Sequence, residues 1–234
     1  LSFGISRDAG VLALVGNALT IAAIQRAVNA GVVVVVAAGN GGADGIGDAD
    51  TAVPAAGANC STTLVCVGGF DAKGLMIAVG AIDSNSSIAS FSNRAGDTAS
   101  AYMVAPGVNV VTTANGGGTA TVSGTSFAAP HVTGAIALLL QRFPSLTGAH
   151  AVSILLASAT DLGASGTDTI FGVGRLNLQT AFAAQGLASI PLTDRVSGNS
   201  ALLISSQIKL GAAFGDAFSK QIFLGQAIIL DAYD

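Results

Sequence analysis

Tryptophan and glutamate are absent from this 234-residue chain, and lysine and arginine together number only nine. Charged residues make up 9% of the sequence and hydrophobic residues 51%, with a mean hydropathy of +0.68. This apolar composition excludes a disordered chain, and so little charge is unusual for a free-standing soluble domain. We infer that partner sequence is missing, or that one face of the chain is normally covered.

Two further absences exclude whole classes of function. Basic residues form no cluster and the net charge is −4, so the electrostatic footprint of a nucleic-acid-binding protein is missing. No apolar run reaches the roughly 18 residues that a membrane-spanning helix needs. The longest runs, residues 31–38 and 135–140, are instead predicted to be buried core elements.

Cysteine is also scarce, since only Cys60 and Cys66 occur. A close pair in a secreted protein indicates one small disulfide, whereas in a cytosolic protein it would be two free thiols or an incomplete metal site. We favour the disulfide. The chain begins at Leu1, within an expected strand and without an initiator methionine or signal peptide, so we expect it to be a piece of a longer protein.

The first part of the chain alternates helix and strand signals. Apolar residues recur at helical spacing over residues 15–30, and Gly31 is suited to end that helix in a left-handed conformation. Five consecutive valines, residues 32–36, and a second apolar stretch, residues 76–82, are typical of strands buried on both faces. This order of elements predicts an α/β domain with a parallel sheet.

Shorter strands, broken by turns at residues 106–107 and 116–118, are predicted between residues 102 and 123. An apolar helix follows and is stopped by Pro144. Because proline lacks an N–H and disfavours helical geometry in the residue before it, we expect this helix to begin at Pro130.

A further helix is predicted to start at Thr147, its N-cap, and to continue to about residue 159. After Gly186 the sequence changes to short strand-like pieces separated by glycine, serine and aspartate. We therefore predict one domain over residues 1–186 and a separate tail or linker over residues 187–234.

The chemistry is concentrated in two segments. Residues 124–131, GTSFAAPH, place the hydroxyl of Ser126 just before the apolar helix, whose first N–H groups can stabilise a developing negative charge. Asn40 directly follows the valine strand. Ligands of parallel α/β sheets bind beyond the carboxyl ends of the strands, where an asparagine amide can donate to a substrate oxygen.

These two segments resemble the subtilisin-like serine proteases. GTSFAAPHVTG, residues 124–134, is similar to the nucleophile motif of that family, and VVVVVAAGN, residues 32–40, to its oxyanion-hole segment. Residues 77–81, 89–93 and 172–177 agree in order, and the resemblance covers about residues 1–186. It implies a subtilisin-like parallel sheet with helices on both faces and the amino-terminal part missing.

The resemblance implies peptide-bond hydrolysis of a polypeptide substrate through an acyl-enzyme. Ser126 would be the nucleophile, and Asn40 would stabilise the oxyanion together with the Ser126 backbone N–H. The substrate backbone would dock along two short segments, whose residues are Ser2, Phe3, Gly4, Ala38 and Gly39.

The aspartate and histidine motifs of that family come before everything seen in this sequence. The two histidines present are His131 and His150. On a helix His131 points about 140° away from Ser126, so we interpret it as a structural core histidine; we interpret His150 as a surface or capping residue. We expect this fragment alone to be inactive. The alternatives are a non-catalytic binding or adhesin module and a hydrolase with another base.

A glycine-rich acidic loop contains Asp44, Asp48 and Asp50. Calcium is conceivable there because oxygen ligands cluster in this way, but the spacing fits no EF-hand and we favour a solvated loop. The same loop fits a dinucleotide fingerprint poorly, because Asp44 stands at its last glycine position and no helix clearly follows.

The tail resembles the connector that follows the protease domain in bacterial autotransporters, on the basis of residues 213–218 and 229–234. That resemblance implies an outer-membrane barrel in the full-length chain and a secreted or surface-displayed protease. The other reading of the tail is a generic extension that packs on the domain.

Overall fold

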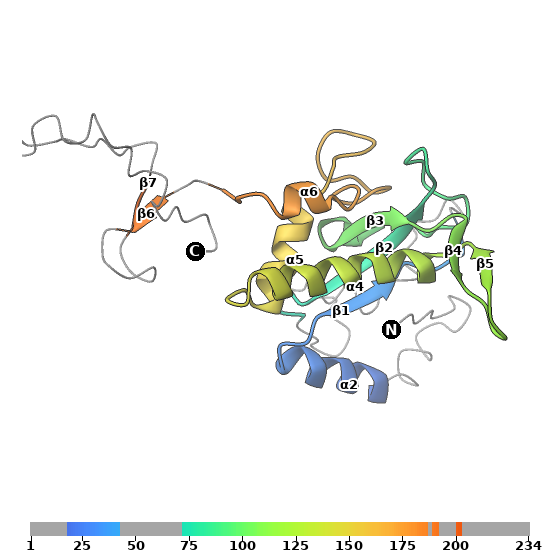
Figure 1. Ribbon diagram of the computed structural model, residues 1–234, viewed down its shortest axis with the longest axis horizontal. Helices are drawn as coiled ribbons and strands as arrows, with labels where there is room; N and C mark the ends of the chain where they lie inside the picture. Colours follow the sequence, from blue (N-terminus) through green and yellow to red (C-terminus); the bar gives the residue numbers. More distant parts are fainter. Residues whose placement is uncertain (1–17, 43–71, 187–188, 192–199, 203–234) are drawn as a thin grey trace, which may run out of the picture. The chain divides into compact units, whose positions relative to one another are not determined.

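A computed structural model of the protein describes residues 18–42, 72–186, 189–191 and 200–202 (Figure 1). The chain divides into two compact units, Leu1–Ala181 and Phe182–Asp234. In the described part of the second unit, β6 (Ser189–Pro191) pairs antiparallel with β7 (Ser200–Leu202). Among the described residues no helix is long and apolar enough to span a membrane. The assignment of residues 187–234 to a linker stays a prediction.

The first described helix, α2 (Ala18–Asn29), ends as its sequence predicts. Gly31 adopts a φ of 79°, and its N–H donates to the Val28 carbonyl at 2.9 Å. The Val32 N–H donates to the Ala27 carbonyl at 3.0 Å, which completes a Schellman ending. Val32 therefore belongs to the helix ending and is 51% exposed, so the expected strand start at residue 32 is wrong.

Three parallel strands form the main sheet in the order β1, β2, β3. They are β1 (Val34–Ala37), β2 (Met76–Ile82) and β3 (Tyr102–Pro106). β2 is central and buried along its whole length, which explains its uninterrupted apolar sequence. The predicted parallel α/β fold is confirmed.

Helices cover both faces of this sheet. On one face α2 packs Ile24 and Val28 against Val36 and Met76. The long helix α4 (Thr125–Arg142) contacts all three strands and runs across the sheet in Figure 1. It buries seven residues at helical spacing: Thr125, Ala128, Ala129, Val132, Ala135, Ile136 and Leu139. Side chains alternate between the two faces along each strand. Val36 and Met76 face α2, so the strand residues next to them point to the opposite face, where α4 packs.

The remaining elements surround this core. A 3-10 helix, η4 (Gly96–Ala101), leads into β3, and the hairpin of β4 (Val110–Thr113) and β5 (Thr119–Val122) leads into α4. Helix α5 (Gly148–Ala157) has the predicted N-cap, because the Thr147 hydroxyl accepts from the His150 N–H at 3.2 Å. The short helix α6 (Leu178–Ala181) closes the first unit.

A glycine-rich segment, residues 171–176, lies along the outer side of β3. The Val173 N–H donates to the Tyr102 carbonyl and the Leu176 N–H to the Val104 carbonyl, both at 2.9 Å. The loop before it is held by Asp168, whose carboxylate accepts from three backbone N–H groups, those of Ala164, Ile170 and Phe171.

Candidate active site

The amino-terminal end of α4 lies at the carboxyl edge of the sheet. Gly107, directly after β3, accepts from the Gly124 N–H at 2.8 Å and donates to the Ile82 carbonyl at 3.0 Å. A Cβ atom at position 107 would lie 2.6 Å from the Ala81 Cβ and 3.1 Å from the Ala128 Cβ. Glycine is therefore required there for the helix to approach the sheet so closely.

Ser126 lies in the first turn of α4 and is exposed. The expectation that the helix begins at Pro130 is wrong, because α4 begins five residues earlier, at Thr125. The helix continues through Pro130, which lacks the N–H that would have donated to the Ser126 carbonyl. The helix start is stabilised instead by Asn40, whose Oδ1 accepts from the Thr125 N–H at 2.9 Å.

The side chain of Asn40 is oriented by Thr125. Its Oδ1 accepts from both the backbone N–H and the hydroxyl of Thr125, at 2.9 and 3.1 Å. Because a backbone N–H can only donate, this contact identifies the oxygen end of the amide, and the Nδ2 end must point elsewhere. Nδ2 lies beside Gly124, where an added Cβ would be 3.8 Å away. The amide donor of Asn40 therefore lies close to Gly124, two residues before Ser126.

The same threonine also holds the backbone next to Asn40. The Gly39 N–H donates to the Thr125 hydroxyl at 3.1 Å, and Gly39 has a φ of 99°, which favours glycine. Ala38 is buried, and its N–H donates to the Val79 carbonyl at 2.8 Å. The predicted role of Ala38 and Gly39 in substrate docking stays a prediction. Ser2, Phe3 and Gly4 lie outside the described residues.

Two residues of this arrangement carried no functional prediction from the sequence. Thr125 is fully buried and joins the two predicted segments, which lie 85 residues apart in the chain. Asn93 is also buried and contacts the backbone on both sides of Asn40. Both residues belong to segments with a family resemblance, but nothing in their local sequence indicates these long-range contacts.

A buried tyrosine forms a hydrogen bond with Asn93. The Tyr102 hydroxyl donates to the Asn93 carbonyl at 2.8 Å, and the side chain is completely buried at the start of β3. Burial raises the pKa of Tyr102 well above its ordinary value, because the charged phenolate would be desolvated. The phenol is therefore neutral, and a donor, over the whole physiological range.

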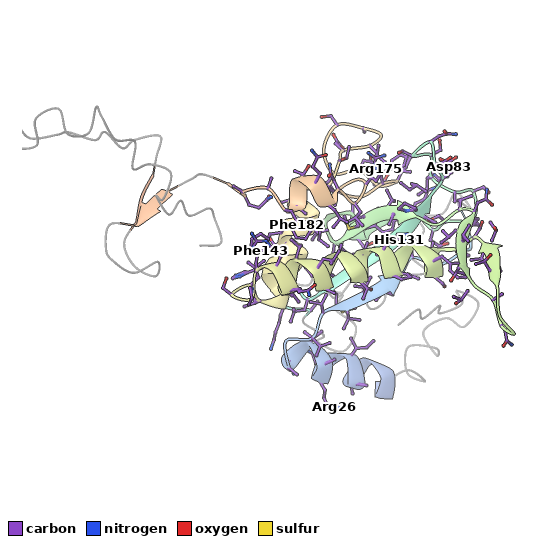
Figure 2. All side chains as sticks on the ribbon, viewed as in Figure 1. Arg26, Asp83, His131, Phe143, Arg175 and Phe182 are labelled. Carbon is purple, nitrogen blue, oxygen red and sulfur yellow. The ribbon has the colours of Figure 1, made fainter. Side chains whose placement is uncertain are left out.

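Neither histidine is placed as a core residue. His131 lies on α4, where Figure 2 labels it, and is exposed; its Nδ1 lies 2.9 Å from the Phe127 carbonyl oxygen of the same helix. The prediction that it is buried is wrong, because position 131 falls on the outer side of α4. His150 is exposed in the first turn of α5, in agreement with its interpretation as a surface or capping residue.

The part of the chain that the structure describes contains no group of three or more histidine, cysteine or acidic residues that could hold a metal ion. The loop with Asp44, Asp48 and Asp50 lies outside that part, and so do Cys60 and Cys66. The calcium and disulfide expectations therefore stay predictions.

Comparison with known proteins gives a consistent result. The sequence profile described as "Subtilase family" matches residues 1–174. Subtilisin DY of Bacillus licheniformis is 36% identical over 160 residues, which cover 68% of this chain and 50% of that protein. Subtilisin E of Bacillus subtilis (strain 168) is 38% identical over 159 residues, covering 68% of this chain and 35% of that protein.

Solved structures of two proteases are also similar. The prenylagaramide maturation protease PagA is 28% identical with a TM-score of 0.49, over 68% of this chain and 53% of that one. The self-cleaved protease domain of PatA is 31% identical with a TM-score of 0.49, over 69% and 53%. The chain spans about half the length of these structures, and half or less of the two subtilisins.

Proposed function

The chain belongs to the subtilase family, and from that premise we propose that it supplies the nucleophile and the oxyanion hole of a serine endopeptidase. Ser126 Oγ attacks the carbonyl carbon of a peptide bond in a polypeptide substrate, the C–N bond breaks, and the amine leaves with the proton given up by the serine hydroxyl. Water then hydrolyses the acyl-enzyme, which releases the carboxylic acid and restores the serine. Asn40 Nδ2 and the Ser126 backbone N–H donate to the oxyanion of each tetrahedral intermediate.

The observation that carries this proposal is the contact between Asn40 and Thr125. It brings the two predicted segments together and sets the direction of the asparagine amide before any substrate binds. A donor that is already oriented needs no reorganisation when charge develops on the substrate oxygen. Its bond strengthens chiefly in the transition state, so its effect belongs to kcat more than to substrate binding.

The proton acceptor for Ser126 does not come from His131 or His150. The His131 ring bonds to its own helix, about 140° around from Ser126, and His150 is on α5. We propose that an aspartate and a histidine come from polypeptide outside these 234 residues, and that the chain alone does not turn over substrate. The chain matches half or less of the length of its subtilisin relatives, which supports this proposal.

The outer side of α4 is a surface that such a polypeptide would cover. No charged residue occurs in α4 before Arg142, and Leu138 is 48% exposed. A long helix whose outer side carries no charge and exposes a leucine suits a position covered inside a larger protein. The exposed positions before Gln141 are Ser126, Pro130, His131, Thr133, Gly134, Ala137 and Leu138. We propose that the segment with the aspartate and histidine packs here, which also explains the low charge of the chain.

The test uses the protease in which this chain is joined to that segment. Ser126→Ala should abolish peptide cleavage and labelling by a fluorophosphonate probe, while the exposed Ser145→Ala should change neither. Asn40→Ala should lower kcat with little change in KM, whereas Asn85→Ala, at an exposed turn, should not. Retained cleavage in Ser126→Ala would refute the proposal. A full-length sequence without the aspartate and histidine would favour the non-catalytic binding module.

We further propose export to the bacterial cell surface as an autotransporter passenger, with a barrel in the full-length chain. The support is the resemblance of residues 213–218 and 229–234 to the connector of that class, and both segments lie outside the described residues. Protease shaving of intact cells should remove the domain. Recovery of the protein in the culture medium of cells whose outer membrane holds none of it would refute the surface anchor.

A further inference from the structure

We propose that Asn93 is a positioning residue that holds the Asn40 donor in place, an inference that rests on the proposed function. Asn93 contacts the backbone on both sides of Asn40. Its backbone N–H donates to the Gly39 carbonyl at 3.0 Å, and its Oδ1 accepts from the Gly41 N–H at 2.8 Å. One residue therefore fixes the position of the tripeptide in whose centre the donor lies.

The fit between this loop and Asn93 is close. A Cβ added at Gly39 would lie 2.6 Å from Asn93 Nδ2, and one added at Gly41 would lie 3.1 Å from Asn93 Oδ1. Ordinary contacts between such atoms begin at about 3.5 Å. The loop thus lies directly on the asparagine amide, and a shorter side chain at position 93 would leave the loop unsupported.

Asn93 is itself fixed to the centre of the sheet. It is only 3% exposed, and its carbonyl accepts from the Tyr102 hydroxyl at 2.8 Å and from the Ser92 hydroxyl at 3.0 Å. The Ser92 hydroxyl in turn accepts from the Ala81 N–H on β2 at 2.9 Å. The loop with Asn40 is therefore attached to β2 and β3, the most deeply buried strands, and does not depend on its own local structure.

The side chain and the backbone of Asn40 are held by different parts of the fold. Thr125 on α4 sets the direction of the Asn40 side chain, and Asn93 sets the position of its backbone. A catalytic group displaced by about 1 Å loses up to ~10²-fold in rate. Asn93→Ala keeps the backbone bond to Gly39 and removes the Oδ1 contact to Gly41, so its effect should act through Asn40 and leave the binding of substrate almost unchanged.

The experiment is a double-mutant cycle on kcat and KM in the protease that contains this chain. Asn93→Ala should lower kcat by about tenfold or more and change KM by less than about twofold. In the Asn40→Ala background the same change should alter kcat by less than about twofold, because the group that it displaces is already absent. An equal loss of kcat in both backgrounds would overturn the inference.

Gly41→Ala tests the contact from the loop side without removing a buried group, in case Asn93→Ala folds poorly. The added Cβ must move the loop away from Asn93 Oδ1, so kcat should fall severalfold in the parent and not in Asn40→Ala. Val152→Ala, a buried change on α5, is the control for destabilisation alone, and it should lower the melting temperature without lowering kcat. A loss of kcat as large in Val152→Ala would also overturn the inference.

A spectroscopic measurement separates this inference from the proposed function. In the Ser126→Ala protein, the NMR signals of the Asn40 side-chain amide should shift or broaden on Asn93→Ala and stay unchanged on Val152→Ala. Unchanged Asn40 signals in Asn93→Ala would refute the positioning role whatever the activity. If Asn40→Ala itself left kcat unchanged, the oxyanion assignment would fail, while the NMR measurement would still decide whether Asn93 holds Asn40.

Discussion

Replacing Gly107 by alanine should separate the start of α4 from the sheet. The added Cβ would meet three atoms, the Ala81 Cβ at 2.6 Å, the Gly124 carbonyl oxygen at 2.9 Å and the Ala128 Cβ at 3.1 Å. The Gly124 carbonyl oxygen and the Ala128 Cβ lie at the start of α4, and the Ala81 Cβ lies on β2. None is the end of a flexible side chain, so the contact is relieved only by moving the helix or the strand.

The size of the movement follows from the contact distances. Carbon atoms pack at about 3.5–4.0 Å, so the contact with Ala81 requires a separation of roughly 1 Å. Overpacking of this kind costs about 1–3 kcal/mol of unfolding free energy. It also strains the 2.8 Å bond from the Gly124 N–H to the Gly107 carbonyl, which holds the helix start against β3. In the complete protease the same displacement should lower kcat by up to ~10²-fold.

The assay is chemical denaturation of the 234-residue protein, with Gly134→Ala as the matched control. Gly134 lies in the interior of the same helix, and a Cβ there would meet no atom within 4 Å. That change should raise the unfolding free energy by about 0.5–1 kcal/mol, because alanine loses less backbone entropy than glycine. Unfolding of Gly107→Ala at the parent's denaturant concentration, or a shift of both variants in the same direction, would refute the close contact between α4 and the sheet at Gly107.

Three further predictions concern stability. Burial raises the pKa of Tyr102, so its neutral form contributes stability that is present below the ordinary phenol pKa of about 10 and lost above it. Denaturation at pH 9 and 11 should therefore show a smaller alkaline loss in Tyr102→Phe than in the parent, and equal losses would contradict this. Thr147→Ala should cost about 0.5–2 kcal/mol through loss of the α5 N-cap, measured by thermal unfolding; an unchanged melting temperature would exclude that cap. Asp168→Ala should leave three backbone N–H groups without their acceptor and make the 161–172 loop sensitive to proteolysis, and an unaltered cleavage rate would argue against its role.

The elements with strong local signals were predicted close to their observed bounds. The periodicity and Gly31 predicted the end of α2, because a Schellman ending depends on only six consecutive residues. The apolar stretch at residues 76–82 coincides with β2, since a central parallel strand is buried on both faces and needs no alternation. Both signals are local, so the sequence was sufficient.

The start of α4 was not predictable in the same way. The local effects of proline predict a helix start at Pro130. The observed helix starts at Thr125, whose N–H donates to Asn40, a residue 85 positions earlier in the chain. The burial of His131 failed for a related reason, because its position on the outer side of α4 depends on which face of the helix meets the sheet. Neither the start of α4 nor the exposure of His131 can be predicted from the residues within one helical turn of them.

By itself, the sequence determined the parallel α/β class and the family, and it predicted two site residues, Ser126 and Asn40. Short motifs carry that information, because a nucleophile segment and a strand-end asparagine must keep their residue types to do their chemistry. Only the tertiary structure decided that Thr125 orients the Asn40 amide and that Asn93 holds its backbone. Those contacts join β1, β2, β3 and α4, and hydrogen bonds between segments so distant in the chain exist only once the sheet has set the segments side by side.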